Sequence, residues 1–308
     1  MFKRILVPTD GSYRSKLALK FVERLSQAEP IDLTLLSVKA SQAVGQPAIY
    51  HGVTGRTTNF TRQKKAHSDA TNDFNWIVNQ SQTQVNQIRL ITEEGAPADR
   101  IVEVATSEKI DLIVMASHGY SAFDRFMYGS VTEAVIGQAP CPVLAVKNDH
   151  IPKHFLIALD KSPVSERILK PAITLAGALG AKITLTYVRT KEDLKASKEF
   201  EELQYLDREL YKVIAKASSG GVDFYLDDVM EKLQDQLDVT VDYIVKEGRP
   251  AKEILNVAAD NRCDLIAMNT HDLKGLRFAW KSSTTQKIFE LTQIPMLISH
   301  FQDDKEDD

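Results

Sequence analysis

The 308-residue sequence contains the same pattern of residues twice, so its fold has to be built from two similar units. A shift of 150 residues carries residues 5–10 onto residues 155–160. Beyond a longer middle loop the shift becomes 153, and it carries residues 95–97 onto residues 248–250. The other pairs under these two shifts are Ser12 with Ser162, Val38 with Val188, 111–113 with 264–266, His118 with His271, and 142–144 with 295–297.

Two domains of about 150 residues each fit both the repeat and the usual size of a single hydrophobic core. We expect one domain at residues 1–148 and a second at residues 152–301. The acidic end at residues 302–308 is expected to be a disordered tail, because a run of like charges repels itself.

Each copy alternates short β-rich runs with helical patterns, which is typical of β-α-β units and a parallel sheet. The runs at 31–38 and 112–115 are almost continuously apolar, as expected for strands covered on both faces. We therefore predict an α/β fold with two doubly wound parallel sheets. In the first copy the strands are predicted at 3–8, 31–38, 86–92, 111–116 and 142–147, and the helices at 13–28, 67–81, 97–108 and 130–138. In the second copy the first helix is predicted to follow the cap Ser162 and to include Pro163, Ile168, Leu169, Ile173, Leu175 and Leu179.

The composition is that of a globular protein, with 43% apolar and 26% charged residues. A formal net charge of −4 provides no basic field that would steer the chain toward nucleic acid. The chain begins directly with a strand and contains no apolar run of membrane-spanning length, so we expect a cytoplasmic protein with no membrane partner. Cys141 and Cys263 lie beside apolar segments without metal or redox spacing, and both are expected to be small buried residues.

In an open parallel sheet a ligand binds beyond the carboxyl ends of the strands, where the winding order reverses. This rule selects three short segments of the first copy as candidate ligand contacts. They are Pro8, Thr9 and Asp10 after the first strand, Val38 after the second, and Met115, Ala116, Ser117, His118 and Gly119 after the fourth.

Nine residues separate Gly119 from Gly129 and Ser130. Glycine lets the backbone approach a phosphate closely, and the free N–H groups at the start of a helix attract an anion. Ser130 and Glu133 form a capping-box pattern that starts a helix at this point. The alternative interpretation is that these residues form only a turn and a helix cap.

Four short motifs of the first copy follow one another in a recognisable order and spacing. They are Val-Pro-Thr-Asp-Gly-Ser at 7–12, Ser-His-Gly at 117–119, Gly-Ser-Val at 129–131 and Ala-Pro-Cys-Pro-Val-Leu at 139–144. Together they resemble the universal stress protein family, and the resemblance extends to the second copy in weaker form. ATP-binding members of that family carry G-x-x-G, nine residues, then G-S or G-T. Ala116 replaces the first glycine here, while Gly119, Gly129 and Ser130 match.

The resemblance implies a five-stranded parallel sheet in each copy, of the Rossmann-like, adenine-nucleotide alpha hydrolase type. It also implies that the last strands, at 142–147 and 295–299, pair within one chain as a pseudo-dimer. The implied ligand of the first domain is ATP, with or without Mg²⁺. The phosphates would lie against Gly119, Gly129, Ser130 and Val131, and the adenine and ribose near Asp10, Val38 and Met115. The complete expected set of nucleotide-binding residues is Pro8, Thr9, Asp10, Val38, Met115, Ala116, His118, Gly119, Gly129, Ser130 and Val131, with no catalytic and no metal-binding residue.

The second copy serves as an internal control, because it keeps the framework but loses the phosphate-loop glycines. It reads Met-Asn-Thr-His-Asp at 268–272, nine residues, then Ser-Ser-Thr at 282–284. Asp272 stands where Gly119 stands, and a carboxylate about 5 Å from a phosphate costs on the order of a few kcal/mol. We expect no ATP binding in this copy. Asp10 and Asp160 are kept in both copies before a helix cap, so a structural role in that turn and a ribose or metal contact are equally open interpretations. His118 and His271 are also kept, and without a catalytic or metal-ligand constellation around them they favour a loop-shaping hydrogen bond.

Three classes of function follow from these observations. The phosphate loop of the first copy favours a nucleotide-binding stress-response or signalling protein. Ala116 and the degenerate second copy favour a nucleotide-independent interaction scaffold. An enzyme that turns over ATP lacks a positioned base and a P-loop, so at most slow hydrolysis is expected. The polar segment 39–67 is expected to be a lid, a solvated loop or a contact in a homodimer.

Overall fold

The computed structural model describes residues 2–10, 15–39, 85–117, 129–191, 193, 222–234, 240–270 and 283–300. The first half of the chain contains β1 (Arg4–Pro8), α1 (Ser15–Ser26), β2 (Ile31–Lys39), β3 (Val85–Glu94), α3 (Pro97–Ser107), β4 (Leu112–Ala116), α4 (Gly129–Ile136) and β5 (Val143–Val146). The second half contains β6 (His154–Leu159), α5 (Pro163–Glu166), α6 (Leu169–Leu179), β7 (Lys182–Arg189), α9 (Val222–Gln234), β8 (Val241–Glu247), α10 (Pro250–Asp260), β9 (Leu265–Thr270), α11 (Thr284–Leu291) and β10 (Met296–His300).

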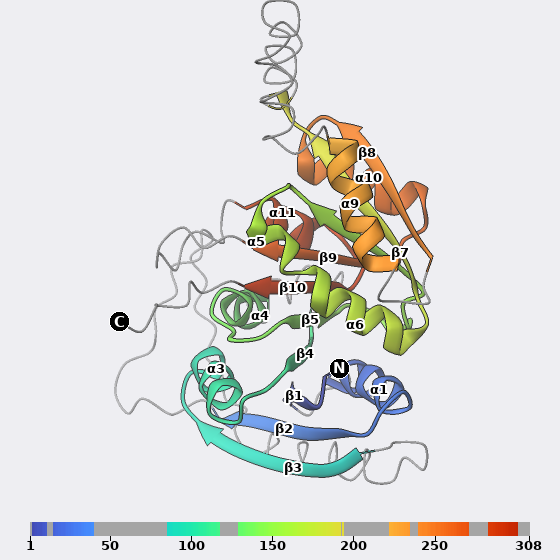
Figure 1. The fold of residues 1–308 in the computed structure, drawn as a ribbon. Coiled ribbons are helices and arrows are strands. Elements are labelled where there is room, and N and C mark those ends of the chain that lie inside the picture. Colours follow the sequence, from blue (N-terminus) through green and yellow to red (C-terminus); the bar gives the residue numbers. More distant parts are fainter. Residues whose placement is uncertain are drawn as a thin grey trace, which may run out of the picture.

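The strands of both halves form one continuous sheet. In the described residues its order is β3-β2-β1-β4-β5-β10-β9-β6-β7-β8, and Figure 1 shows β5 and β10 in the middle with one domain on either side. Neighbouring strands are parallel within each half, whereas β5 and β10 are antiparallel. Each half is therefore a doubly wound parallel sheet of five described strands, and the expected intrachain pairing of the last strands is confirmed.

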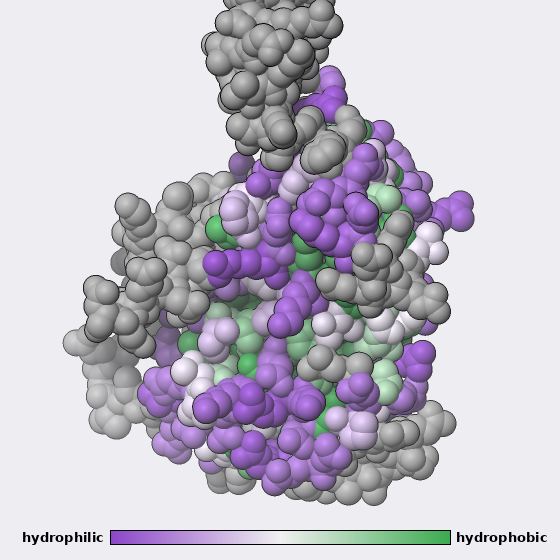
Figure 2. Space-filling model, in the orientation of Figure 1, coloured by the Kyte–Doolittle hydropathy of each residue, from purple (hydrophilic) through white to green (hydrophobic). Residues whose placement is uncertain are grey.

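Helices cover both faces of this sheet. One apolar core lies under α1, α6 and α9, and the other lies under α3, α4, α10 and α11. Each core contains strand residues of both halves, so the apolar interior continues from one domain into the other. On the face drawn in Figure 2, hydrophilic residues predominate, and apolar residues show mainly in the middle, where the domains meet. No helix in the described ranges is long and apolar enough to cross a membrane.

The elements predicted in the first copy lie within two residues of their observed bounds, except for the helix at 67–81, which falls outside the described residues. The acidic tail at 302–308 also falls outside them.

In the second copy, the single first helix that we predicted is divided into α5 and α6. Ser162 caps α5 as expected, because its side chain accepts a hydrogen bond from the Ser165 N–H at 3.0 Å. Pro171 explains the division, since its ring nitrogen has no hydrogen to donate to the carbonyl four residues earlier and its ring would clash with that carbonyl. Pro171 is tolerated in the first turn of α6, where an N–H is not needed.

Both cysteines are buried and free of disulfides, as expected. Burial raises the pKa of the Cys141 thiol to about 12 and that of the Cys263 thiol to about 11. Both thiols are protonated near neutral pH and therefore unreactive.

Asp111 joins the start of β1 to the start of β4. Its Oδ2 atom accepts hydrogen bonds from the backbone N–H of Lys3 at 3.0 Å and of Arg4 at 2.8 Å. The backbone N–H of Asp111 donates in return to the carbonyl of Arg4 at 2.8 Å. A carboxylate that accepts from two backbone groups of a neighbouring strand holds the two strands in one register.

Asp264 repeats this arrangement between β6 and β9. Its Oδ1 atom accepts from the backbone N–H of His154 at 2.7 Å and of Lys153 at 2.9 Å. Its own N–H donates to the carbonyl of His154 at 2.9 Å. Each copy thus uses an aspartate at the equivalent position to hold its first strand against its fourth.

We expect Asp111→Ala and Asp264→Ala each to lower the free energy of unfolding by about 2 kcal/mol, because two backbone donors lose a charged acceptor. Urea unfolding measures this change. Asp227→Ala is the control, because Asp227 is exposed on α9 and its loss should cost less than about 0.5 kcal/mol. Equal decreases in the unfolding free energy of Asp111→Ala, Asp264→Ala and Asp227→Ala would contradict the role given to Asp111 and Asp264.

His154 is a buried histidine at the start of β6, and its side chain is 7% exposed. Its Nε2 atom lies 2.8 Å from the Thr184 hydroxyl and 3.7 Å from the Cys263 sulfur. Burial, followed by the positive charge of Lys182, lowers the pKa of His154 below its ordinary value of 6.5. The fold therefore favours the neutral imidazole.

A histidine whose pKa is lowered in the folded state makes the free energy of unfolding depend on pH. The unfolded chain takes up a proton as the pH falls through about 6.5, before the folded chain does. The stability associated with neutral His154 is thus present above that pH and lost below it. We expect wild type to lose more unfolding free energy than His154→Gln between about pH 7 and about pH 5. Equal losses in calorimetric or urea unfolding would show that His154 is not held neutral.

Candidate functional site

The first domain has its candidate site where β1 and β4 lie side by side. The chain proceeds from β1 through β2 to β3 on one side of this junction and from β4 to β5 on the other. The winding of the sheet therefore reverses between β1 and β4, and in open parallel sheets a ligand binds in a crevice beyond the carboxyl ends of the strands at such a reversal. We refer to this place as the crevice of the first domain, and to the equivalent place beyond β6 and β9 as the crevice of the second.

The described parts of the predicted segments meet at this edge of the sheet. Pro8 pairs with Leu36 on β2, and Ala116 pairs with Val146 on β5. The expected contacts that the structure brings to the ends of the three adjacent strands β2, β1 and β4 are Val38, then Pro8, Thr9 and Asp10, then Met115 and Ala116.

The positions at this edge differ in how much of the side chain remains accessible. Thr9 is 6% exposed and its N–H donates to the Leu36 carbonyl at 2.8 Å, so the chain leaves β1 as an extension of the sheet. Asp10 is exposed, and Met115 is buried. Ala116 is part of β4 and has no positive φ, so its methyl group fits where the family pattern has glycine.

Ser117 belongs to the candidate segment after β4, but it is not in the expected set of nucleotide-binding residues. Its N–H donates to the Val146 carbonyl at 2.8 Å, which extends β4 by one residue. The side chain is 4% exposed, yet its hydroxyl oxygen has no hydrogen-bond partner in the part of the chain that the structure describes. A buried hydroxyl without a partner is costly, so this atom is suited to bind a ligand group at the crevice. Its place between Ala116 and His118, inside the quoted motif, is the signal that could have revealed it.

Gly129, Ser130 and Val131 form the first turn of α4. A helix that links parallel strands begins at their carboxyl edge, so this turn belongs to the same side of the sheet as the crevice. Its first N–H groups have no carbonyl partner within the helix and are available to an anion. Of the remaining expected contacts, His118 and Gly119 lie outside the described residues, and the side chain of Ser130 is not described.

In the second domain, Asn269 takes the position of Ala116 under the shift of 153 residues, and its side chain is buried. Its Nδ2 atom donates to the carbonyl of Val164 in α5 at 2.7 Å. The backbone carbonyl of Asn269 accepts from the hydroxyl of Thr285, in the first turn of α11, at 2.9 Å. Asn269 therefore links the end of β9 to α5 and α11, although its side-chain Oδ1 atom, like the Ser117 hydroxyl, is buried without a hydrogen-bond partner among the described residues.

The turn residues of the second domain have structural partners as well. One carboxylate oxygen of Asp160 accepts from the N–H of Ser162 at 2.9 Å and from its hydroxyl at 2.5 Å, which stabilises the turn after β6. Ser283 caps α11 by accepting from the Gln286 N–H at 3.0 Å. The capping box is only half formed, because the Gln286 amide donates to Glu290 at 2.7 Å.

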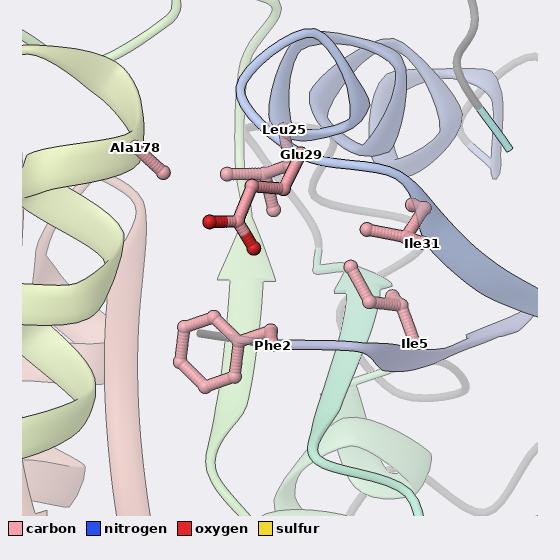
Figure 3. A pocket seen from close by; sticks show the side chains of 6 residues that line it. All are labelled: Phe2, Ile5, Leu25, Glu29, Ile31 and Ala178. Carbon is pink, nitrogen blue, oxygen red and sulfur yellow. The ribbon is translucent and has the colours of Figure 1, made fainter.

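A hollow near the amino ends of β1 and β2, away from the candidate site, is a poor alternative site. Figure 3 shows it between Ala178 of α6 and side chains from the first domain. Glu29 is the charged residue of an otherwise apolar lining that also includes Phe2, Ile5, Leu25 and Ile31. A carboxylate repels phosphate, so this hollow does not suit a nucleotide. Within the described residues, no group of histidine, cysteine and acidic side chains could hold a metal ion.

Comparisons with known proteins agree on one family. The sequence profile of the universal stress protein family matches residues 1–147 and again residues 152–300. Universal stress protein MJ0577 of Methanocaldococcus jannaschii is 31% identical over 155 residues, which cover 48% of this chain and 96% of that protein. A universal stress protein of Thermus aquaticus is 32% identical over 151 residues, which cover 48% of this chain and all (100%) of that protein.

A solved structure shows the same architecture over the complete length. The crystal structure of a universal stress protein from Archaeoglobus fulgidus aligns with 98% of this chain and 97% of that chain, with a TM-score of 0.65 and 18% identity. The two profile matches divide the chain as the sheet does, at the antiparallel junction of β5 and β10. The chain belongs to the universal stress protein family and carries two of its domains in tandem.

Proposed function

We propose that this chain binds ATP in the crevice of its first domain and acts as a nucleotide-dependent stress-response or signalling protein. The second domain is its structural or regulatory partner. The observation that carries this proposal is the difference between the two crevices. The first has the small residue Ala116 at the end of β4, next to a buried Ser117 hydroxyl without a partner among the described residues, whereas in the second Asn269 takes the place of Ala116 and donates to the Val164 carbonyl of α5.

The residues of the first crevice suit the parts of an adenine nucleotide. The first turn of α4 offers N–H groups to the phosphates, together with Gly119 of the matching motif. Met115 and Val38 provide apolar surface for the base, and the Asp10 carboxylate can accept from ribose hydroxyls. Mg²⁺ would arrive with the triphosphate, whose charge it neutralises. We expect at most slow hydrolysis, because Asp10 is exposed and no metal-binding cluster exists among the described side chains.

Calorimetric titration with MgATP is expected to show about one site per chain. Gly129→Asp should abolish binding, because it places a carboxylate at the phosphate position while an acidic residue at a helix start leaves α4 intact. Ser283→Asp is the matched control in the second domain, where aspartate replaces one good N-cap residue with another. Failure of the folded wild type to bind would favour the nucleotide-independent scaffold instead.

A finer variant tests the contact that the structure adds. Ser117→Ala removes a buried hydroxyl that has no partner among the described residues, so the ligand-free protein should be at least as stable to urea as wild type. Affinity for ATP should fall about five- to tenfold, the usual effect of one lost hydrogen bond. Thr270→Val alters the equivalent position of the second domain and should leave affinity unchanged. Equal ATP affinity in wild type and Ser117→Ala would remove Ser117 from the site.

A further inference from the structure

The junction between the domains is the antiparallel pair of β5 and β10. Each of these strands is the outermost strand of its own domain, and the two occupy equivalent places in the repeat. In the observed register, Met296 lies opposite Ala145, Leu297 opposite Leu144, and Ile298 opposite Val143. The shift of 153 residues carries Leu144 onto Leu297, so the two halves are related by an approximate twofold axis at this pair. The same register could in principle join β5 to a second β5, or β10 to a second β10.

Side-chain size distinguishes the observed pairing from these two alternatives. The observed pair places the largest side chain, Met296, beside the smallest, Ala145. Pairing of two β5 strands would place Ala145 opposite Val143 at both positions and leave space unfilled. Pairing of two β10 strands would place Met296 opposite Ile298 at both positions and crowd them.

These differences matter because the side chains concerned are all buried in one core. Val143, Ala145, Met296 and Ile298 belong to the apolar cluster under α4 and α11, and each is at most 1% exposed. Unfilled volume and overpacking both destabilise a close-packed interior. Pairing of β5 with β10 gives both positions a combined side-chain size between those of the two alternatives, with Met296 beside Ala145 and Ile298 beside Val143.

Lys147, which follows β5, adds a directional contact to the other domain. Its Nζ atom donates to the carbonyls of Phe289 and Thr292 at the end of α11, the latter at 2.9 Å. The same atom lies 4.4 Å from the centre of the Phe289 ring. Unpaired carbonyls at a helix C-terminus and the face of an aromatic ring both attract a cation. Burial lowers the pKa of Lys147 to about 8, so the cation predominates at neutral pH.

This contact is also specific to the pairing of unlike domains. Under the shift of 153 residues, Phe289 corresponds to Ile136 at the end of α4, and Lys147 corresponds to His300. If β5 met a second β5, Lys147 would meet Ile136, which has no aromatic face. The cation would lose its ring contact and keep only helix carbonyls.

We propose that the β5 and β10 edges are matched to each other and mismatched to themselves, so that the junction selects the second domain of the chain over the first domain of another copy. Ala145 with Met296 and Lys147 with Phe289 are the selecting pairs. The partner that fits the β5 edge is therefore a β10 edge.

Because the first domain is synthesised before the second, this selectivity matters while the chain is being made. The first domain is complete at Val146, whereas β10 ends at His300. At about 5–20 residues per second, roughly 10–30 s pass between the two events, and N-terminal domains fold first. During that time each new chain displays an apolar edge strand, which is a template for pairing with neighbouring chains. A mismatch between two β5 edges limits this error.

The test is a compensating pair of substitutions, read by light scattering after size exclusion. Ala145→Met opposes Met296 within the chain and crowds the junction, but it fills the gap that two β5 strands would leave. We expect a concentration-dependent heavier species that wild type lacks. Adding Met296→Ala restores one large and one small residue at the observed pair and should restore the wild-type mass. A wild-type mass for Ala145→Met, or no restoration by the second change, would overturn the proposal.

Lys147→Met provides an independent test that leaves both strands unchanged, and it decides the matter if Ala145→Met does not fold. Hydrogen exchange at residues 143–146 and 296–299 should become about tenfold faster, because a charged cap and a ring contact are lost at the junction. Lys153→Met is the control, since Lys153 caps α6 through the Leu179 carbonyl at 2.7 Å inside the second domain. Unchanged exchange in Lys147→Met would refute the role of the lysine.

Discussion

Pairing of β1 with β4 decides where the sheet of the first domain reverses its winding. Asp111 holds this pair by accepting two backbone hydrogen bonds from the start of β1. The register of the strands then brings the ends of β1, β2 and β4 to one edge, where the chain must leave the sheet in opposite directions. The crevice is a consequence of that reversal, and the second domain repeats it through Asp264.

The two domains show how one framework supports two different surfaces. Their strands, helices and bracing carboxylates correspond, so the difference between their crevices does not come from the fold. It comes from side chains at the carboxyl edge, above all Ala116 in one copy and Asn269 in the other. Alanine has no polar side-chain group at the end of β4, whereas the longer amide of Asn269 reaches α5 and binds it.

Much of this architecture could be predicted from the sequence, because the repeat, the apolar runs and the caps all indicate the same elements. The division of α5 from α6 was missed, since the pattern of apolar residues continues through Pro171 while the backbone hydrogen bonds cannot. The sequence places Ser117 in the segment after β4 but does not distinguish it from its neighbours, because its burial and its hydrogen bonds depend on tertiary packing. Asn269 was read only as a lost glycine pattern, since its bond to Val164 joins residues 105 positions apart.

Hydrogen exchange with and without MgATP tests the central claim most directly, because it locates the ligand as well as detecting it. We expect slower exchange after β1, after β4 and in the first turn of α4, with no change at the corresponding positions after β6, after β9 and in α11. Protection confined to the second domain, or no protection in either, would contradict a nucleotide site in the first crevice.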